Sequence, residues 1–407
     1  MTGVKKGVVL GLWVATLVAV FVVARVTAPP ESTSAIDDFG TALRAALAEK
    51  DGVDRAERTA SLLQRLDSEN VPEAAATYSR MINILDEHDI RPFALAWARF
   101  DPAAALDHAI SWPFQDKQKM GAGAVIEGWA MKDPTAAREA YEEIRERLPG
   151  LGEDMFVGLL AGWLYSGKDG LDEFLAGLSR QQRDTAITKV AARLMRIGGP
   201  EAMMSWADSI VRNAAYEKRF KRLVFRRGIR MVGRWYPERA AAWAMEHAGQ
   251  DYAIDAPRIV AGLWGRHAGL IAMQWVRDHP DEETHELAVR EAFRTWFMSD
   301  PKGAVAWLES ETPTAFHDPA IIFYAKDLND RDPETAIGWC ERIHDSDERL
   351  RCLRLAAAAW YQRDAVAAET WLQQSPLDEE ARRFARTPPE QAQAVKRKVR
   401  PGQPPSF

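Results

Sequence analysis

Basic side chains are the residues of this 407-residue sequence whose type and spacing point most clearly to chemistry. Guanidinium and ammonium groups bind carboxylates and phosphates, and a guanidinium can do so with two parallel hydrogen bonds. With Glu217, the segment up to position 234 carries a net charge of +7, although the whole chain carries −6. The basic residues of this segment are Lys218, Arg219, Lys221, Arg222, Arg226, Arg227, Arg230 and Arg234.

Basic residues also recur in two sets that lie four positions apart along the chain. The first set is Lys189, Arg226, Arg258, Arg290 and Arg354, and the second is Arg193, Arg230, Arg294 and Lys326. Stacked helices would align both sets into a groove for an acidic partner. Alternatively, these side chains pair with acidic residues of neighbouring helices and pack their stems over apolar surface. The first interpretation gives the candidate partner-binding residues Lys218, Arg222, Arg226, Arg227, Arg230, Arg234, Arg258, Arg290 and Arg294.

Other chemical motifs do not emerge from the sequence. It has no glycine-rich phosphate loop, no His-Glu-x-x-His, no Cys-x-x-Cys and no Gly-x-Ser-x-Gly. The eight histidines are scattered, and none lies four residues from another. We therefore expect no catalytic residues, no metal site and no cofactor. The net charge of −6 gives no reason to expect nucleic acid as a partner.

The basic residues belong to a repeating pattern about 32 residues long. In its clearest copies an aromatic residue is followed four positions later by Asp, often with Pro next. An Ala lies four positions beyond the Asp, and a Trp three beyond the Ala. We call the Asp position the origin of each copy. The origins are Asp101, Asp133, Gly167, Gly199, Tyr236, Ala268, Asp300, Asp332 and Asp364, and a weaker copy centres on Val71. This periodicity predicts repeated structural units that bury their apolar faces against their neighbours.

Each copy predicts two α-helices. Apolar residues at −11, −8, −7 and −4 from the origin form one face of a first helix. The Asp at the origin can cap the second helix, and the Pro that follows suits its first position. In the second helix, Ala at +4 lets the two helices approach each other, and Trp at +7 fills the space between units, as in Ala304 and Trp307. We interpret these Trp residues as core.

This pattern resembles tetratricopeptide-like repeats, with Sel1-like and HEAT-like repeats as near neighbours. The resemblance covers residues 54–376 and rests on paired helices with an Asp turn, an Ala four residues later and an aromatic residue beyond. The period of 32 residues instead of 34, the aromatic residue at +7, and the missing Trp-Leu-Gly-Tyr set depart from that family. The resemblance implies an all-α solenoid whose surface binds peptides or proteins, without catalytic chemistry.

The N-terminus indicates a membrane anchor. No charged residue lies between Lys6 and Arg25, so residues 7–24 are uncharged, and the segment 7–26 is long enough to cross a bilayer as a helix. Lys5 and Lys6 on one side predict a cytoplasmic N-terminus and place the bulk of the chain in the bacterial periplasm. A cleaved signal peptide is the alternative, although Pro29 disfavours cleavage after Ala28.

Cys340 and Cys352, the two cysteines of the sequence, are predicted to form a disulfide. An oxidising compartment favours pairing. Residue 346 lies midway between them, in the predicted turn of a helical hairpin, so they would lie at the same height on adjacent helices. Two unpaired core residues are the alternative.

Together these observations predict a fold and a function. We expect an α/α-solenoid of about nine to ten helix pairs after one transmembrane helix. The predicted segments are a cytoplasmic N-terminus (1–6), the anchor (7–26), a linker with a first helix (27–53), the solenoid (54–376), and a helix end with a disordered basic tail (377–407). We expect the most irregular joint between Trp206 and Phe225, where five additional residues break the period. A non-enzymatic inner-membrane scaffold that binds an acidic protein or peptide partner is the expected function. A cell-wall glycan-associated enzyme or its accessory subunit, and a purely structural spacer, are the alternatives.

Overall fold

The structure, a computed structural model, describes residues 38–279 and 285–387. These residues form 21 α-helices and two short 3-10 helices, and they contain no β-strand. The predicted membrane segment at 7–26 and the predicted tail beyond 387 lie outside the described residues. Within the described part of the chain, no helix combines the length and apolar character needed to cross a membrane. The prediction of an all-α chain is confirmed for the residues described.

The chain divides into two compact units, residues 1–162 and 163–407. In the first unit, α2 and α5 each pack against both the helix that follows and the next helix but one, as α5 does against α6 and α7. The described helices of this unit are α2 (Phe39–Leu47), α3 (Gly52–Gln64), α4 (Val71–Met81), α5 (Glu87–Ala98), α6 (Pro102–Ile110), α7 (Gln115–Lys132) and α8 (Pro134–Arg147), then η1 (Pro149–Leu151) and most of α9 (Gly152–Ser166).

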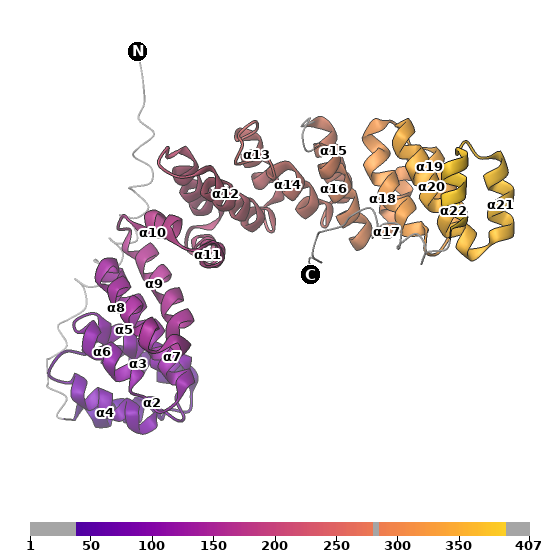
Figure 1. Cartoon of the computed structure of the whole chain (residues 1–407). Coiled ribbons are helices and arrows are strands. Elements are labelled where there is room, and N and C mark those ends of the chain that lie inside the picture. The colour runs from indigo at the N-terminus through magenta and orange to yellow at the C-terminus, as the bar shows by residue number, and fades with distance from the viewer. Residues whose placement is uncertain (1–37, 280–284, 388–407) are drawn as a thin grey trace, which may run out of the picture. The chain divides into compact units, whose positions relative to one another are not determined.

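The second unit repeats the same packing scheme over a longer stretch (Figure 1). Helix α14, for example, contacts α12, α13, α15 and α16. The helices of this unit after α9 are α10 (Leu171–Gly177), α11 (Arg180–Arg212), α12 (Lys218–Gly233), α13 (Pro237–Glu246), α14 (Ala256–Gly265), α15 (Gly269–Asp278), α16 (His285–Ser299), α17 (Pro301–Ser310), η2 (Ala315–His317), α18 (Asp318–Leu328), α19 (Pro333–Glu341), α20 (Ser346–Arg363), α21 (Ala365–Gln374) and α22 (Glu379–Arg386).

The predicted origins coincide with helix starts. Seven of the nine are the N-cap residues of second helices, which begin at the next residue. At the five aspartate origins the carboxylate accepts a hydrogen bond from the backbone N–H three residues later, as Asp300 does from Gly303 at 3.0 Å. Tyr236 and Ala268 occupy the same position without a side-chain cap. The predicted capping role of the aspartates is therefore confirmed.

Two glycine origins depart from this scheme. Gly167 has a φ of 63°, and the following second helix starts four residues later, at Leu171. Gly199 has a φ of 65° and a ψ of −159°, so it bends α11 into two helical parts, the second of which starts at Pro200. Glycine tolerates positive φ because it has no Cβ, which explains why neither origin is an aspartate.

The additional residues between Trp206 and Phe225 are accommodated mainly as helix. The second part of α11 extends to Arg212, and α12 starts at Lys218 after a loop of five residues. Helices α11 and α12 pack closely against each other. We expected the most irregular joint here, but the departures from the repeating helix starts lie earlier, at Gly167 and Gly199.

The core lies between the first and second helices of consecutive pairs. The small residues at +4 are buried, and Ala304 and Ala368 are fully inaccessible. Trp307, at +7, is 7% exposed and contacts the rings of Phe293 and Trp296 in the preceding first helix. The interpretation of these Trp residues as core is confirmed for Trp243, Trp307 and Trp339. The other three Trp at this position, Trp206, Trp275 and Trp371, are partly exposed.

Candidate anion-binding site

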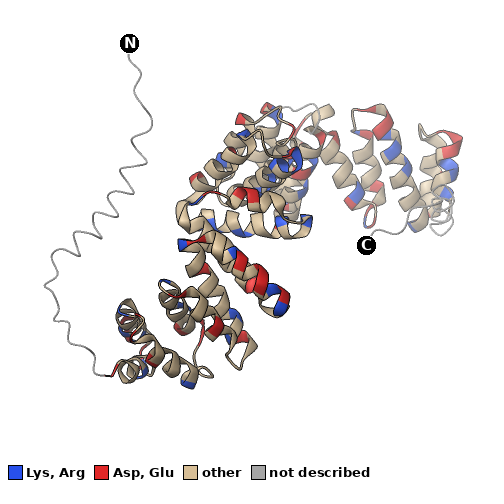
Figure 2. Ribbon diagram, turned by 60° about the vertical axis from the view of Figure 1, so that its left-hand side comes forward, with Lys and Arg blue, Asp and Glu red and all other residues tan. Residues whose placement is uncertain are grey.

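Helix α12 carries the basic segment on one side and core on the other. One face of the helix is apolar and buried, and its residues are adjacent or lie three or four positions apart. They are Phe220, Val224, Phe225, Ile229 and Val232. This stripe fixes the helix against its neighbours and turns its remaining positions outward. Basic and acidic side chains are both spread over the described helices (Figure 2), so the basic face of α12 is a local concentration of charge.

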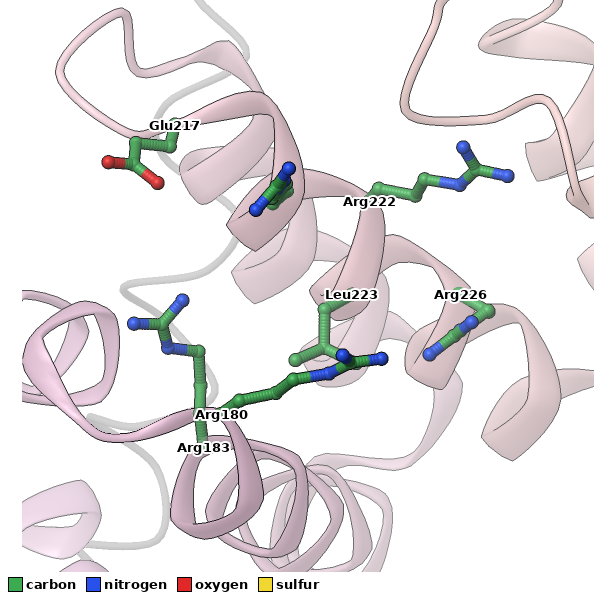
Figure 3. A pocket seen from close by; sticks show the side chains of 7 residues that line it. Arg180, Arg183, Glu217, Arg222, Leu223 and Arg226 are labelled. Atoms are coloured by element: carbon green, nitrogen blue, oxygen red, sulfur yellow. The ribbon is translucent and has the colours of Figure 1, made fainter. Parts of the chain in front are cut away.

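A pocket of about 490 Å³ lies between the start of α11 and the first half of α12, within the second unit. We call it the α11–α12 pocket. Five guanidinium groups and one carboxylate surround it, together with one aliphatic side chain (Figure 3). The lining residues are Arg180, Arg183, Glu217, Arg219, Arg222, Leu223 and Arg226.

Two of these arginines have defined partners within the protein. Arg222 contacts Asp255 of the next helix pair, with Nε and Oδ2 3.0 Å apart. Arg183 donates hydrogen bonds to the carbonyl oxygens of Ala176 and Leu178 at the end of α10, and its guanidinium lies 5.8 Å from the centre of the Phe220 ring. These contacts hold both side chains in place at the walls of the pocket.

The remaining pocket arginines form no direct contact with a carboxylate of the described residues, although the charges of Arg180 and Arg226 help to lower the pKa of the nearby Asp184. Within the described part of the chain, no ion pair or hydrogen bond from the side chain reaches Arg180, Arg219 or Arg226. Arg226 is a partly buried residue, and partial burial strengthens the interaction of a cation with any anion that enters because less water screens it. Glu217, the N-cap residue of α12, is the one acidic group of the lining.

Arg227 has a structural role. Its Nε donates to Oδ1 of Asp184 on α11 at 3.1 Å, and its second nitrogen binds the other carboxylate oxygen. This bidentate contact holds the pKa of Asp184 below its usual value. Arg227 therefore ties α12 to α11. Lys218 similarly pairs with Asp251.

The positive charge continues from the pocket along α12. Arg230 has no ion-pair partner among the described residues and lies four residues beyond Arg226. Burial lowers the pKa of its guanidinium, and the nearby charges of Arg226, Arg227 and Arg258 lower it further. The carboxylate of Asp255, which contacts Arg222, acts on the pKa of Arg230 in the opposite direction and offsets part of this repulsion.

Some of the other candidate residues fit the interpretation as a groove for an acidic partner, and others fit the interpretation as contacts within the protein. Arg294 forms two hydrogen bonds with Glu291 on its own helix, and Arg258 lies 4.0 Å from Asp255. Arg234 packs over the ring of Trp235, at 5.5 Å from its centre. No ion pair involves Arg290 in the part of the chain that the structure describes, although its charge contributes to lowering the pKa of Glu291. The structure thus places Arg222, Arg226, Arg230 and Arg258 together, whereas Lys218, Arg227, Arg234 and Arg294 make local contacts.

Sequence reasoning missed Arg180 and Arg183. Both lie at the start of α11, more than 30 residues before the basic segment, and neither falls on the recurring basic positions. Their approach to α12 depends on how two helices pack across an irregular copy of the repeat. Glu217 and Arg219 lie inside the basic segment, so the sequence alone already pointed to them.

The described residues contain no cluster of three or more histidine, cysteine or carboxylate groups arranged to hold a metal ion. The arrangement at the pocket instead suits reversible binding of an anion. Comparison with known proteins gives no match to a family model, a curated protein or a solved structure.

The two cysteines lie in adjacent helices, Cys340 near the end of α19 and Cys352 in α20. Their Cα atoms are 5.5 Å apart, and the structure joins their sulfur atoms. Cys340 is fully buried and Cys352 is partly exposed. This geometry permits the predicted disulfide, and its formation in the native compartment remains a prediction that depends on the location of the chain.

Proposed function

We propose that this chain is a non-enzymatic scaffold that binds an acidic segment of a partner protein along α12, beginning at the α11–α12 pocket. The observation that carries the proposal is the concentration of unpaired guanidinium groups at this place: Arg180, Arg219, Arg226 and Arg230. Elsewhere, many basic side chains of the second unit have acidic partners within the protein, as Arg239 has in Glu201 and Arg277 in Glu311.

The proposed scaffold is an α/α-solenoid of nine to ten helix pairs. Its support is the agreement between the 32-residue period and the helix starts, and the packing of first helices such as α12, α14, α16 and α18 on their own second helix and on the next first helix. Such arrays present repeated side-chain positions on a continuous surface, which suits recognition of extended partners.

The proposed location is the periplasmic side of an inner membrane, with residues 7–26 as the anchor. Its support is the uncharged stretch between Lys6 and Arg25 and the lysines before it. The proximity of Cys340 and Cys352 agrees with an oxidising compartment.

Affinity capture from native membranes after brief cross-linking tests the binding proposal. We expect wild-type protein to retain a partner with an acidic exposed segment, and high salt to release it before cross-linking. Replacing Arg226 and Arg230 with Glu should abolish this capture. Arg227 is left unchanged because its substitution would break the contact with Asp184 and confuse binding with stability. Capture of the same proteins by wild type and variant would contradict the proposal.

A further inference from the structure

The α11–α12 pocket combines charge with an aliphatic contact. Leu223 is its one apolar lining side chain, and it is partly exposed, whereas its neighbours Val224 and Phe225 are buried in the core. In Figure 3, the side chain of Leu223 points from α12 toward the arginine side chains of α11 that line the pocket. Because removing exposed apolar surface from water is favourable, an apolar group of a ligand would gain free energy by covering Leu223.

The charges lie on both sides of Leu223. Arg219 lies four residues before it and Arg226 three residues after it on α12, so all three share one face of the helix. The distance along the helix axis from Arg219 to Arg226 is about 10 Å, from a rise of about 1.5 Å per residue. An extended peptide covers this length with about three residues.

This layout favours a peptide over a single small anion. A pocket of about 490 Å³ holds several side chains, whereas one carboxylate or phosphate group would satisfy one or two arginines and leave Leu223 uncovered. Glu217 at one end of the pocket repels further acidic groups, so the acidic part of the ligand is confined to the stretch beside Arg219 and Arg226.

We propose that the pocket recognises an acidic peptide segment in which an aliphatic side chain lies between two carboxylates, with the aliphatic group on Leu223 and the carboxylates on the flanking arginines. This inference rests on the proposed function and specifies its ligand. The charges supply attraction and the aliphatic contact supplies selectivity, because acidic segments without the aliphatic residue cannot cover Leu223.

Synthetic peptides test this selectivity with the full-length protein in lipid nanodiscs. The probes are fluorescein-labelled peptides containing Glu-Glu-Leu-Glu-Glu, Glu-Glu-Ser-Glu-Glu or Gln-Gln-Leu-Gln-Gln, and fluorescence anisotropy gives their dissociation constants. We expect the leucine peptide to bind about tenfold more tightly than the serine peptide, from partial burial of its side chain. The glutamine peptide should bind most weakly because it lacks charge.

Two variants connect this preference to Leu223. Leu223→Ser should bind the leucine and serine peptides equally, whereas Leu223→Met should keep the preference because methionine retains an apolar side chain of similar volume. Unchanged thermal unfolding of both variants shows that the fold is intact.

Three outcomes would overturn the inference, and they separate it from the proposed function. Equal binding of the leucine and serine peptides to wild type would show that the pocket reads charge alone, and the proposed function would stand. Displacement of the leucine peptide by inorganic phosphate as effectively as by unlabelled leucine peptide would indicate a simple anion site. Failure of both acidic peptides to bind better than the glutamine peptide would refute both proposals.

Discussion

The indole rings of Trp296 and Trp307 pack with their centres 5.9 Å apart and their planes at 43°. Trp296 lies four residues before an origin and Trp307 seven residues after it, so this contact joins the two helices of one pair. The same relationship recurs in Trp264 with Trp275 and in Trp360 with Trp371, at 6.1 and 6.4 Å. One kind of side-chain contact thus recurs in three helix pairs and fixes the spacing of the two helices in each.

Replacing Trp307 with Ala should lower the free energy of unfolding by about 3–5 kcal/mol, because a large buried ring is removed and a cavity remains. A double-mutant cycle with Trp296 should give a coupling energy of about 0.5–1.5 kcal/mol. Trp235 is 69% exposed, so Trp235→Ala serves as the control and should change stability by less than about 0.5 kcal/mol. Denaturant unfolding measures all three. A Trp307→Ala variant as stable as the control would contradict this account of the core.

Removing a capping aspartate should lower the stability of the protein, and adding one should raise it. Asp300→Ala should destabilise by about 1 kcal/mol because the N–H of Gly303 loses its acceptor, whereas Asp300→Ser should keep most of the stability. Ala268 occupies the same position without a side-chain acceptor, so Ala268→Asp should stabilise by a similar amount. Thermal unfolding of the three variants measures the differences. A lack of stabilisation by Ala268→Asp would show that this cap position is not equivalent to that of Asp300.

Cys340 and Cys352 should resist alkylation when the protein is isolated from an oxidising compartment without reducing agent. Closing a loop of this length stabilises by about 3 kcal/mol in the chain-entropy model, so reduction should lower the unfolding midpoint. Mass spectrometry after alkylation counts the free thiols. A double Cys→Ser variant, which should be insensitive to reductant, is the control. Two alkylated thiols in the unreduced protein would contradict the prediction.

The apolar segment at 7–26 should keep the protein in the membrane fraction during washes with high salt or alkaline carbonate, because neither weakens the insertion of an apolar helix. A reporter enzyme fused to the C-terminus should be active in the periplasm. Deleting residues 7–26 should release the protein from membranes. Recovery of a soluble form that begins near Pro29 would instead identify the segment as a cleaved signal peptide.

The helix starts were largely predictable because the capping signal is local. Asp332 and Asp364 each accept from a backbone N–H three residues away, so a few consecutive residues carry the whole signal. The exceptions at Gly167 and Gly199 depend on positive φ, and the sequence does not distinguish a glycine that bends a helix from one that separates two helices.

The candidate site was predictable only in part, because its partners are distant in sequence. The basic segment identified α12, but Arg227 reaches Asp184 across 43 positions and Arg222 reaches Asp255 across 33. Periodicity places residues on a face and does not say which of them will find an acidic partner there. The contribution of Arg180 and Arg183 likewise depends on the packing of α11 against α12.

The central claim, that unpaired arginines on α12 bind an acidic segment, is tested most directly by one comparison of affinities. The full-length protein in nanodiscs is titrated with the labelled Glu-Glu-Leu-Glu-Glu peptide at low and at physiological salt. Arg226→Gln with Arg230→Gln is compared with Lys302→Gln with Lys326→Gln, which removes the same charge from exposed positions in α17 and α18.

The account predicts that the arginine variant binds at least about tenfold more weakly than wild type and responds less to salt, because two charge-assisted contacts are lost. The lysine variant should bind like wild type, and all three proteins should unfold at similar temperatures. Equal affinities of the arginine and lysine variants would contradict the claim, because binding would then reflect net charge and not the surface formed by α11 and α12.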